Sequence, residues 1–272
     1  MADNLENALY IVATPIGNLE DITLRAINVL KNVDIIAAED TRNTSVLLQK
    51  YSISTKLISY HKYSENSRLD LFLEYLNSGK SIALVSDAGT PLISDPGNIL
   101  VKEVLKEGFK VVPIVGASAV IGLLSSVYRD GEDFKFIGFL PRVKNQISEM
   151  VSKNKFENLV FYESPNRLLE TLECIKENYP DKVVSIGREL TKKFEEIKTD
   201  NIENIIEYYK NNTLKGEIVV LLHKTEAKDE IDIDDKIKKL KALKLKDKEV
   251  SLILSELYGL NKNYVYKKCL EN

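Results

Sequence analysis

Short apolar runs and amphipathic stretches alternate through the first 115 residues, and this alternation most limits the folds open to the chain. The apolar runs predict strands, and the stretches between them have the three-to-four-residue spacing of helices. The predicted strands are residues 9–13, 34–38, 57–60, 81–85 and 110–115. A chain that alternates in this way forms a largely parallel sheet with helices packed on its faces.

A second series of strand-like runs begins at residue 134 and predicts a second α/β region. The expected strands are residues 134–140, 158–162, 182–186 and 217–222, with a helix near 165–178. Gly116 follows the last strand of the first series, so we place an N-terminal α/β domain at 1–115 and a C-terminal α/β domain at 116–226. Two domains suit a chain of 272 residues, because domains of about 100–150 residues are commonest.

The segment 236–272 differs from the rest of the chain in charge and in pattern. It holds ten lysines and four acidic residues, a charge of +6, whereas the whole chain carries −3. Residues 227–235 before it resemble an acidic linker. Apolar residues at helical spacing predict short helices, and Gly259 is expected to end one of them. These apolar residues are Ile237, Leu240, Leu243, Val250, Ile253, Leu254, Leu257, Val265 and Leu270. The arrangement is helix-turn-helix-like, and a helical cap on the second domain is the alternative.

Composition favours a protein of a reducing compartment. No run approaches the roughly 18 apolar residues of a membrane span, and the N-terminal residues are neither basic nor apolar, so no secretory signal is expected. The two cysteines, Cys174 and Cys269, lie far apart, and Cys174 belongs to a helical pattern in which it is expected to be buried. We therefore expect a cytoplasmic protein without a membrane segment.

Three loops that follow predicted strands contain the small residues of a ligand site. They are residues 14–18 (TPIGN), 86–97 (SDAGTPLISDPG) and 116–119 (GASA). The carboxyl ends of parallel strands share one edge of a sheet, and ligands of open α/β sheets bind there. Glycine lets backbone approach a ligand closely, and a helix that opens at the third loop offers free N–H groups to an anion. Together the loops predict one extended pocket for a nucleotide-like ligand.

Signatures of several common sites are absent from the sequence. It has neither the phosphate-binding pattern Gly-x4-Gly-Lys-Ser/Thr nor Gly-x-Gly-x-x-Gly after the first strand, and it lacks the hydrolase pattern Gly-x-Ser-x-Gly. His61 and His223 are the only histidines, and the cysteines form no close pair, so the sequence argues against a zinc centre. No metal is expected.

Charged residues follow three further strands. Glu39, Asp40 and Arg42 come after the strand at 34–38, where two carboxylates and an arginine either pair with one another or meet substrate. Residues 163–167 (ESPNR) follow another strand. Residues 188–196 are dense in charge and fit either a solvated turn or a phosphate site. His61 fits either a half-buried imidazole or a substrate contact.

Eight of these motifs occur in one order along the chain. They are residues 14–21, 39–42, 59–61, 86–97, 116–118, 138–141, 163–167 and 188–192. In this order they resemble the ribosomal RNA methyltransferases of the tetrapyrrole methylase superfamily, the class III methyltransferases, from about residue 8 to 225. The resemblance implies an α/β fold of two domains of tetrapyrrole methylase type with a cleft between them, plus a small C-terminal helical unit.

The resemblance also implies an activity. It implies S-adenosylmethionine (S-adenosyl-L-methionine) as cofactor and 2′-O-methylation of a cytidine ribose in the decoding region of small-subunit (16S) rRNA. The implied partners are small-subunit rRNA or the small ribosomal subunit and a second copy of the chain in a homodimer, with no membrane. The alternatives are a related class III methylase of a small molecule or of a translation-factor side chain, and a non-catalytic RNA-binding module.

Individual residues receive expected roles from their positions in these motifs. The expected cofactor-binding residues are Pro15, Ile16, Gly17, Val85, Ser86, Asp87, Gly89, Thr90, Ser118, Ala119 and Glu163. A ribose hydroxyl is a weak acid that a base or a nearby charge would help to ionise. The expected catalytic residues are therefore Glu39, Asp40, Arg42 and Glu163. The expected RNA contacts are Arg42, His61, Arg167, Arg188 and Lys192.

Overall fold

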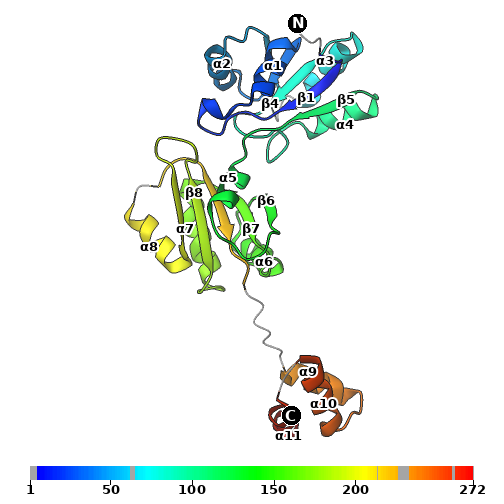
Figure 1. Ribbon diagram of the computed structural model, residues 1–272, viewed down its shortest axis with the longest axis vertical. Coiled ribbons are helices and arrows are strands. Elements are labelled where there is room, and N and C mark those ends of the chain that lie inside the picture. Colours follow the sequence, from blue (N-terminus) through cyan, green and yellow to red (C-terminus); the bar gives the residue numbers. More distant parts are fainter. Residues whose placement is uncertain (1–4, 62–64, 213, 226–232, 259–260, 272) are drawn as a thin grey trace. The chain divides into compact units, whose positions relative to one another are not determined.

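The computed structural model of the protein describes residues 5–61, 65–212, 214–225, 233–258 and 261–271. The chain forms two compact units, residues 1–224 and residues 225–272 (Figure 1). The predicted boundary at residue 116 falls inside the first unit, so the division of that unit into two domains stays a prediction. Residue 226, most of the predicted linker, Gly259 and residue 272 lie outside the described residues.

The first sheet of the larger unit is parallel throughout, as predicted. Its strands lie in the order β3-β2-β4-β1-β5, and each neighbouring pair is parallel. The strands are β1 (Ala8–Val12), β2 (Ile35–Ala38), β3 (Lys56–Ser59), β4 (Ile82–Val85) and β5 (Lys110–Ile114). Because all five strands are parallel, the loops after β1, β2, β4 and β5 lie at one edge of the sheet.

Helices cover both faces of this sheet because successive strand residues point to opposite sides. Tyr10 of β1 packs in a cluster with residues of α1 and α2, whereas its neighbour Leu9 packs with residues of α3 and α4. The helices are α1 (Leu24–Asn32), α2 (Thr41–Lys50), α3 (Glu65–Asn77) and α4 (Asn98–Lys106), and a 3-10 turn, η1 (Leu19–Asp21), precedes α1. Side chains cap η1, α1 and α2: Asn18 accepts from the N–H of Glu20, Thr23 from that of Ala26, and Asp40 from that of Arg42.

The second sheet is mixed and has the order β6-β7-β10-β8-β9. β6 and β7 are parallel, whereas β10 runs antiparallel to β7 and β8, and β9 runs antiparallel to β8. Its strands are β6 (Lys135–Phe139), β7 (Leu159–Glu163), β8 (Val183–Arg188), β9 (Glu196–Asn201) and β10 (Ile218–Leu222). Helices α6 (Lys144–Lys153), α7 (Pro165–Lys176) and α8 (Ile202–Asn211) pack on one face, and α5 (Ala119–Ser126) packs on the other.

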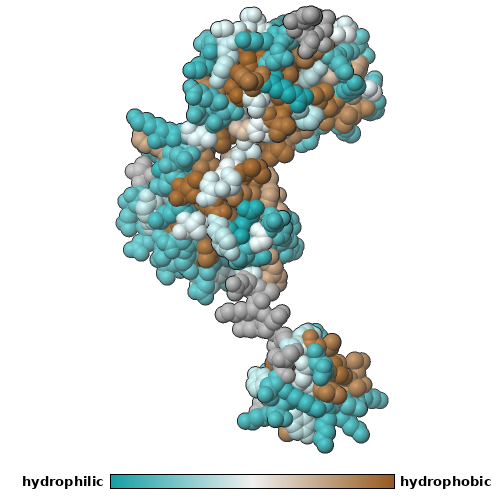
Figure 2. Space-filling model, in the orientation of Figure 1, coloured by the Kyte–Doolittle hydropathy of each residue, from teal (hydrophilic) through white to brown (hydrophobic). Residues whose placement is uncertain are grey.

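The C-terminal unit, considered by itself, is a bundle of three helices. They are α9 (Ile233–Ala242), α10 (Asp247–Tyr258) and α11 (Lys262–Glu271), around a core that includes Ile237, Val250 and Cys269. The assignment of Leu243 and Leu257 to the apolar face was wrong, because they are 71% and 69% exposed. Figure 2 shows hydrophobic side chains at the surface of this unit beside hydrophilic ones. Within the described residues, no helix is long and apolar enough to cross a membrane.

Candidate active site

The three small-residue loops meet at the carboxyl edge of the first sheet, as the sequence predicts. The N–H of Thr14 donates to the carbonyl oxygen of Gly89 at 2.8 Å, and the N–H of Gly89 donates back to Thr14 at 3.0 Å. The Thr90 hydroxyl reaches the carbonyl oxygen of Ala117 at 3.5 Å. The loop after β4 therefore joins the loops after β1 and β5.

A cavity of about 500 Å³ lies beside these loops and is also lined by the second sheet, through residues such as Tyr162, Gly187 and Val219. Its volume falls within the usual range of about 300–1,000 Å³ for small-molecule sites. The predicted cofactor residues that line the cavity are Ile16, Asp87, Gly89, Thr90, Ser118, Ala119 and Glu163. The strand-end loops and the second sheet thus form one pocket.

Four predicted cofactor residues do not line this cavity. Pro15, Val85 and Ser86 are buried beneath its wall, and the Ser86 hydroxyl donates to the carbonyl oxygen of Ala88 at 3.3 Å. Gly17 is exposed and packs against Lys192, whose Cγ would lie 2.4 Å from a Cβ added at Gly17. The structure assigns these four residues a part in shaping the wall, and their contact with a cofactor stays a prediction.

Five carboxylates line the cavity, and three of them, Glu39, Asp87 and Asp95, come from the loops of the first sheet, whereas Glu163 and Glu217 belong to the second-sheet side. Burial raises the pKa of the Glu39 carboxyl, and the negative charges of Asp95 and Asp87 raise it further. Burial likewise raises the pKa of Asp95, with a smaller contribution from Asp87. The backbone N–H of Asp40 donates to Asp87 at 3.0 Å and ties the loop after β2 to the loop after β4. Asp95 was not singled out by the sequence, although it lies in the 86–97 loop.

The other proposed bases are engaged elsewhere. Asp40 pairs with Arg42 at 2.6 Å, and hydrogen bonds from Arg42 lower its pKa to about 2. Glu163 has a side chain with no exposed surface. Its two oxygens accept hydrogen bonds, each of 2.8 Å, from the N–H of Ser164 and the hydroxyl of Thr171. Glu39 also lines the cavity, where it accepts a hydrogen bond from the backbone of Asp87, and within the described residues it forms no ion pair.

The five predicted RNA contacts fall into two groups. Arg42, whose side chain is 88% exposed, and His61 lie at the surface. Arg167 donates to the carbonyl oxygen of Pro141 at 2.7 Å and lies 3.4 Å from Glu163. Arg188 and Lys192 belong to the charged loop, which we define as residues 188–195. The first group is exposed, although Arg42 also pairs with Asp40, whereas the second is less exposed and is held by neighbouring protein groups.

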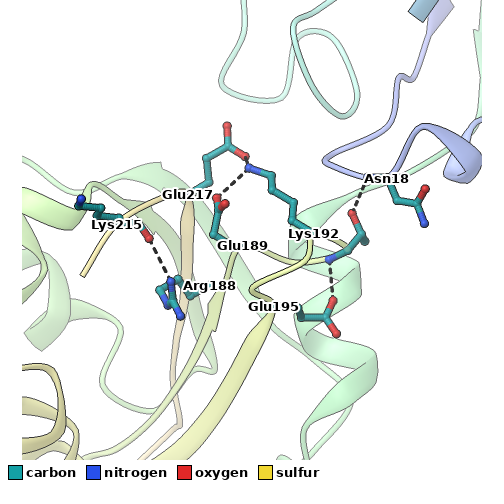
Figure 3. Close-up of polar contacts among 8 residues, drawn as sticks. Asn18, Arg188, Glu189, Lys192, Glu195, Lys215 and Glu217 are labelled. Carbon is teal, nitrogen blue, oxygen red and sulfur yellow. Dashed lines mark hydrogen bonds and ion pairs between the residues drawn. The ribbon is translucent and has the colours of Figure 1, made fainter. Parts of the chain in front are cut away.

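Much of the charged loop is an exposed turn, as one of the two alternatives held, but ion pairs of Lys192 order it. Lys192 Nζ lies 2.8 Å from Glu189 Oε1 and 2.9 Å from Glu217 Oε2, as Figure 3 shows. The Thr191 hydroxyl accepts a hydrogen bond of 3.0 Å from the N–H of Asn18. The loop thereby connects the second sheet to the segment after β1 that carries Ile16 into the cavity.

Comparison with known proteins shows which families and relatives this chain is similar to. Residues 8–206 match the family model of tetrapyrrole (corrin/porphyrin) methylases. The chain is 46% identical over 219 residues to ribosomal RNA small subunit methyltransferase I of Halalkalibacterium halodurans, covering 80% of this chain and 76% of that one. It is 40% identical over 277 residues to the Escherichia coli O157:H7 protein of that name, covering 99% and 97% of the two chains.

A solved structure extends the comparison to the fold. Uroporphyrin-III C-methyltransferase from Thermus thermophilus, in complex with S-adenosylhomocysteine, has a TM-score of 0.55 to this protein. The two sequences are 16% identical, and the match covers 79% of this chain and 96% of the other. At that identity the likeness concerns the fold alone.

Proposed function

The chain belongs to the tetrapyrrole methylase family, and from that premise we propose that it is an S-adenosylmethionine-dependent methyltransferase of small-subunit ribosomal RNA. The names of relatives that are 40% to 46% identical support this substrate. The finer proposal is that the acceptor is the 2′-hydroxyl of a cytidine ribose in the decoding region. The observation that supports methyl transfer by this chain is a cavity lined by the predicted cofactor residues and by Glu39.

The cavity fits S-adenosylmethionine in charge and in shape. When bound, this cofactor supplies an electrophilic methyl group on a sulfonium cation. Carboxylates such as Asp87 and Asp95 favour a cation in a site shielded from water. Gly89 has a φ of +78°, a backbone conformation that suits glycine, and brings the main chain to the cavity wall. Ile16, Thr90, Ser118 and Ala119 would complete the contacts.

Glu39 is proposed to remove the proton from the ribose hydroxyl. Because its pKa is raised by burial and by two neighbouring carboxylates, its ionised form is a stronger base than an ordinary glutamate. Asp40 and Glu163, which the sequence also proposed as bases, are instead proposed to shape the site: Asp40 begins α2 and Glu163 is bonded to α7. A base of this kind contributes typically 10²- to 10⁴-fold to rate.

The substrate is proposed to approach the site past surface cations. Arg42 and His61 are exposed and would contact phosphate, while Arg167, Arg188 and Lys192 would act on RNA only indirectly, through the loops that they hold.

We propose the small ribosomal subunit or its naked rRNA as the partner, a homodimer as the working assembly and the cytoplasm as the location.

Methyl transfer tests the proposal directly. Purified protein is mixed with S-adenosylmethionine labelled in the methyl group and with unmodified small subunits, naked small-subunit rRNA, a corrin-type macrocycle or a translation factor. We expect label in the rRNA of the first or second reaction, together with cofactor binding before any RNA is added.

Two results would contradict this function. Label in the macrocycle or in the translation factor, with none in rRNA, would make the chain a methylase of another substrate. RNA binding without any binding of S-adenosylmethionine would make it a non-catalytic RNA-binding module.

A further inference from the structure

Strand β6 carries a bulge immediately before its last residue. Along the pairing with β7, β6 advances from Phe136 to Phe139 while β7 advances only from Val160 to Tyr162, so β6 contains one extra residue. Gly138 lies in this bulge with a φ of +70°, a left-handed conformation. An inserted residue of this kind changes the face of the sheet to which the following side chain points.

The bulge decides which face of the sheet carries Phe139. In a regular strand, Phe139 would lie on the face opposite to Phe136, because side chains alternate. Instead both rings pack against Tyr162, with centroid separations of 5.0 Å for Phe136 and 5.6 Å for Phe139. Ile137, between them, packs into the cluster on the other face. The bulge therefore moves Phe139 onto the face that lines the cavity.

Phe139 lines the cavity and is nevertheless 56% exposed. More than half of the Phe139 surface therefore remains open to contact by a ligand, although the ring packs on Tyr162. Tyr162, which supports its ring, also lines the cavity. The result is an aromatic face held by a second ring and open both to solvent and to the proposed reaction site.

We propose that Phe139 is the platform on which the base of the target nucleotide stacks while its ribose enters the cavity. The proposal rests on the RNA-methylating function proposed above. Proteins that recognise unpaired RNA splay bases out and stack them on aromatic side chains. The carboxylates of the cavity disfavour phosphate in its interior, whereas the apolar ring at its exposed side suits a base of any sequence.

Four variants test the platform: Phe139→Ala, Phe139→Leu, Phe139→Tyr and, as a control, Phe156→Ala. Phe156 is 54% exposed and does not line the cavity, so its truncation removes a similar ring from a site away from the reaction. The measurements are kcat/KM for methylation of the RNA substrate and the Kd for S-adenosylmethionine. Thermal melting verifies that each variant is folded.

We expect Phe139→Ala and Phe139→Leu to lower kcat/KM for RNA by about 5- to 150-fold, the range that corresponds to about 1–3 kcal/mol of base stacking. Phe139→Tyr keeps a stacking ring and should stay within about twofold of wild type, as should Phe156→Ala. The Kd for S-adenosylmethionine should change by less than about twofold in all four variants.

Each contrary result has a distinct meaning. Wild-type activity in Phe139→Leu would overturn the platform and leave the proposed function intact. A rise in the Kd for S-adenosylmethionine that matches the loss of kcat/KM would assign Phe139 to the cofactor and also overturn the platform. If the wild-type protein transfers no methyl group to RNA, the proposed function fails, and the platform fails with it.

Discussion

Glu39 lines the same cavity as Asp87 and Asp95. We expect its ionised carboxylate to be needed for activity but to lower stability. We predict that Glu39→Gln lowers the single-turnover rate of RNA methylation by about 10²- to 10⁴-fold, because the amide cannot accept the proton. The same change should raise Tm at pH 7, because it removes a negative charge from beside two others. Glu107→Gln, an exposed glutamate at the end of α4, serves as the control. A fall in Tm together with an unchanged rate would show that Glu39 has a structural role only.

The pH dependence of the reaction follows from the raised pKa of Glu39. The base acts when ionised, so the single-turnover rate should be constant at high pH and fall as pH drops through a pKa above that of an ordinary glutamate. The effect of ionising Glu39 on folding stability is opposite to its effect on the rate. A raised folded-state pKa contributes stability below the unfolded-state pKa and loses it as pH rises through the folded-state value. The Tm gain of Glu39→Gln should therefore shrink from pH 7 towards pH 4. A rate profile that titrates at or below the usual glutamate value would contradict this assignment.

Asp87 is predicted to recognise the positive charge of the methyl donor. Asp87→Asn should weaken the binding of S-adenosylmethionine about tenfold, the size expected for losing one charge contact of about 1–2 kcal/mol. Binding of S-adenosylhomocysteine, which lacks the sulfonium charge, should weaken much less. Isothermal titration calorimetry with both ligands measures the difference, and equal weakening of the two would mean that Asp87 acts through the loop that it bonds at Asp40.

At the scale of an element, the charged loop fits against the segment after β1 only because residue 17 is glycine. A Cβ at this position would lie 2.4 Å from Lys192 Cγ and 2.9 Å from the Thr191 hydroxyl. We predict that Gly17→Ala weakens the binding of S-adenosylmethionine, because the displaced segment also carries Ile16 into the cavity. Gly122→Ala is the matched control, since its Cβ would make only an ordinary contact of 3.7 Å with Leu190. Unchanged binding in Gly17→Ala would separate the charged loop from the cofactor site.

Apolar strands were predictable, including the bulged β6, whereas the polar strand β9 and two amphipathic helices were not. All five strands of the first sheet were predicted; β1, β2 and β4 are fully buried apolar runs, whereas β3 and β5, at the edges, are only partly buried. β9 was missed, because its sequence, EIKTDN, is polar and follows a charge-dense segment. It is an edge strand, where exposed charged side chains are common. Helices α6 and α8 were also not predicted. Residues 138–141 were singled out as one of the ordered motifs, but nothing in the sequence indicates that Gly138 forms a bulge, so Phe139 was not proposed as a site residue.

At the scale of the whole molecule, the sequence predicted which loops form the site but not which side chains contact one another there. The order of the motifs predicted which loops meet, and the Thr14–Gly89 bridge confirms that two of them do. The sequence could not distinguish Glu39 from Asp40, because only the fold decides that one lines the cavity while the other pairs with Arg42. It likewise could not reveal that Lys192 lies between two carboxylates from separate segments.

The identity of the methylated nucleoside tests the central claim most directly. Small-subunit rRNA labelled by the protein is digested to nucleosides, and the labelled product is identified by mass spectrometry and located in the rRNA by nuclease mapping. The account predicts a single labelled species, 2′-O-methylcytidine, at one position in the decoding region. Label on a base, on another nucleoside or at many positions would contradict it.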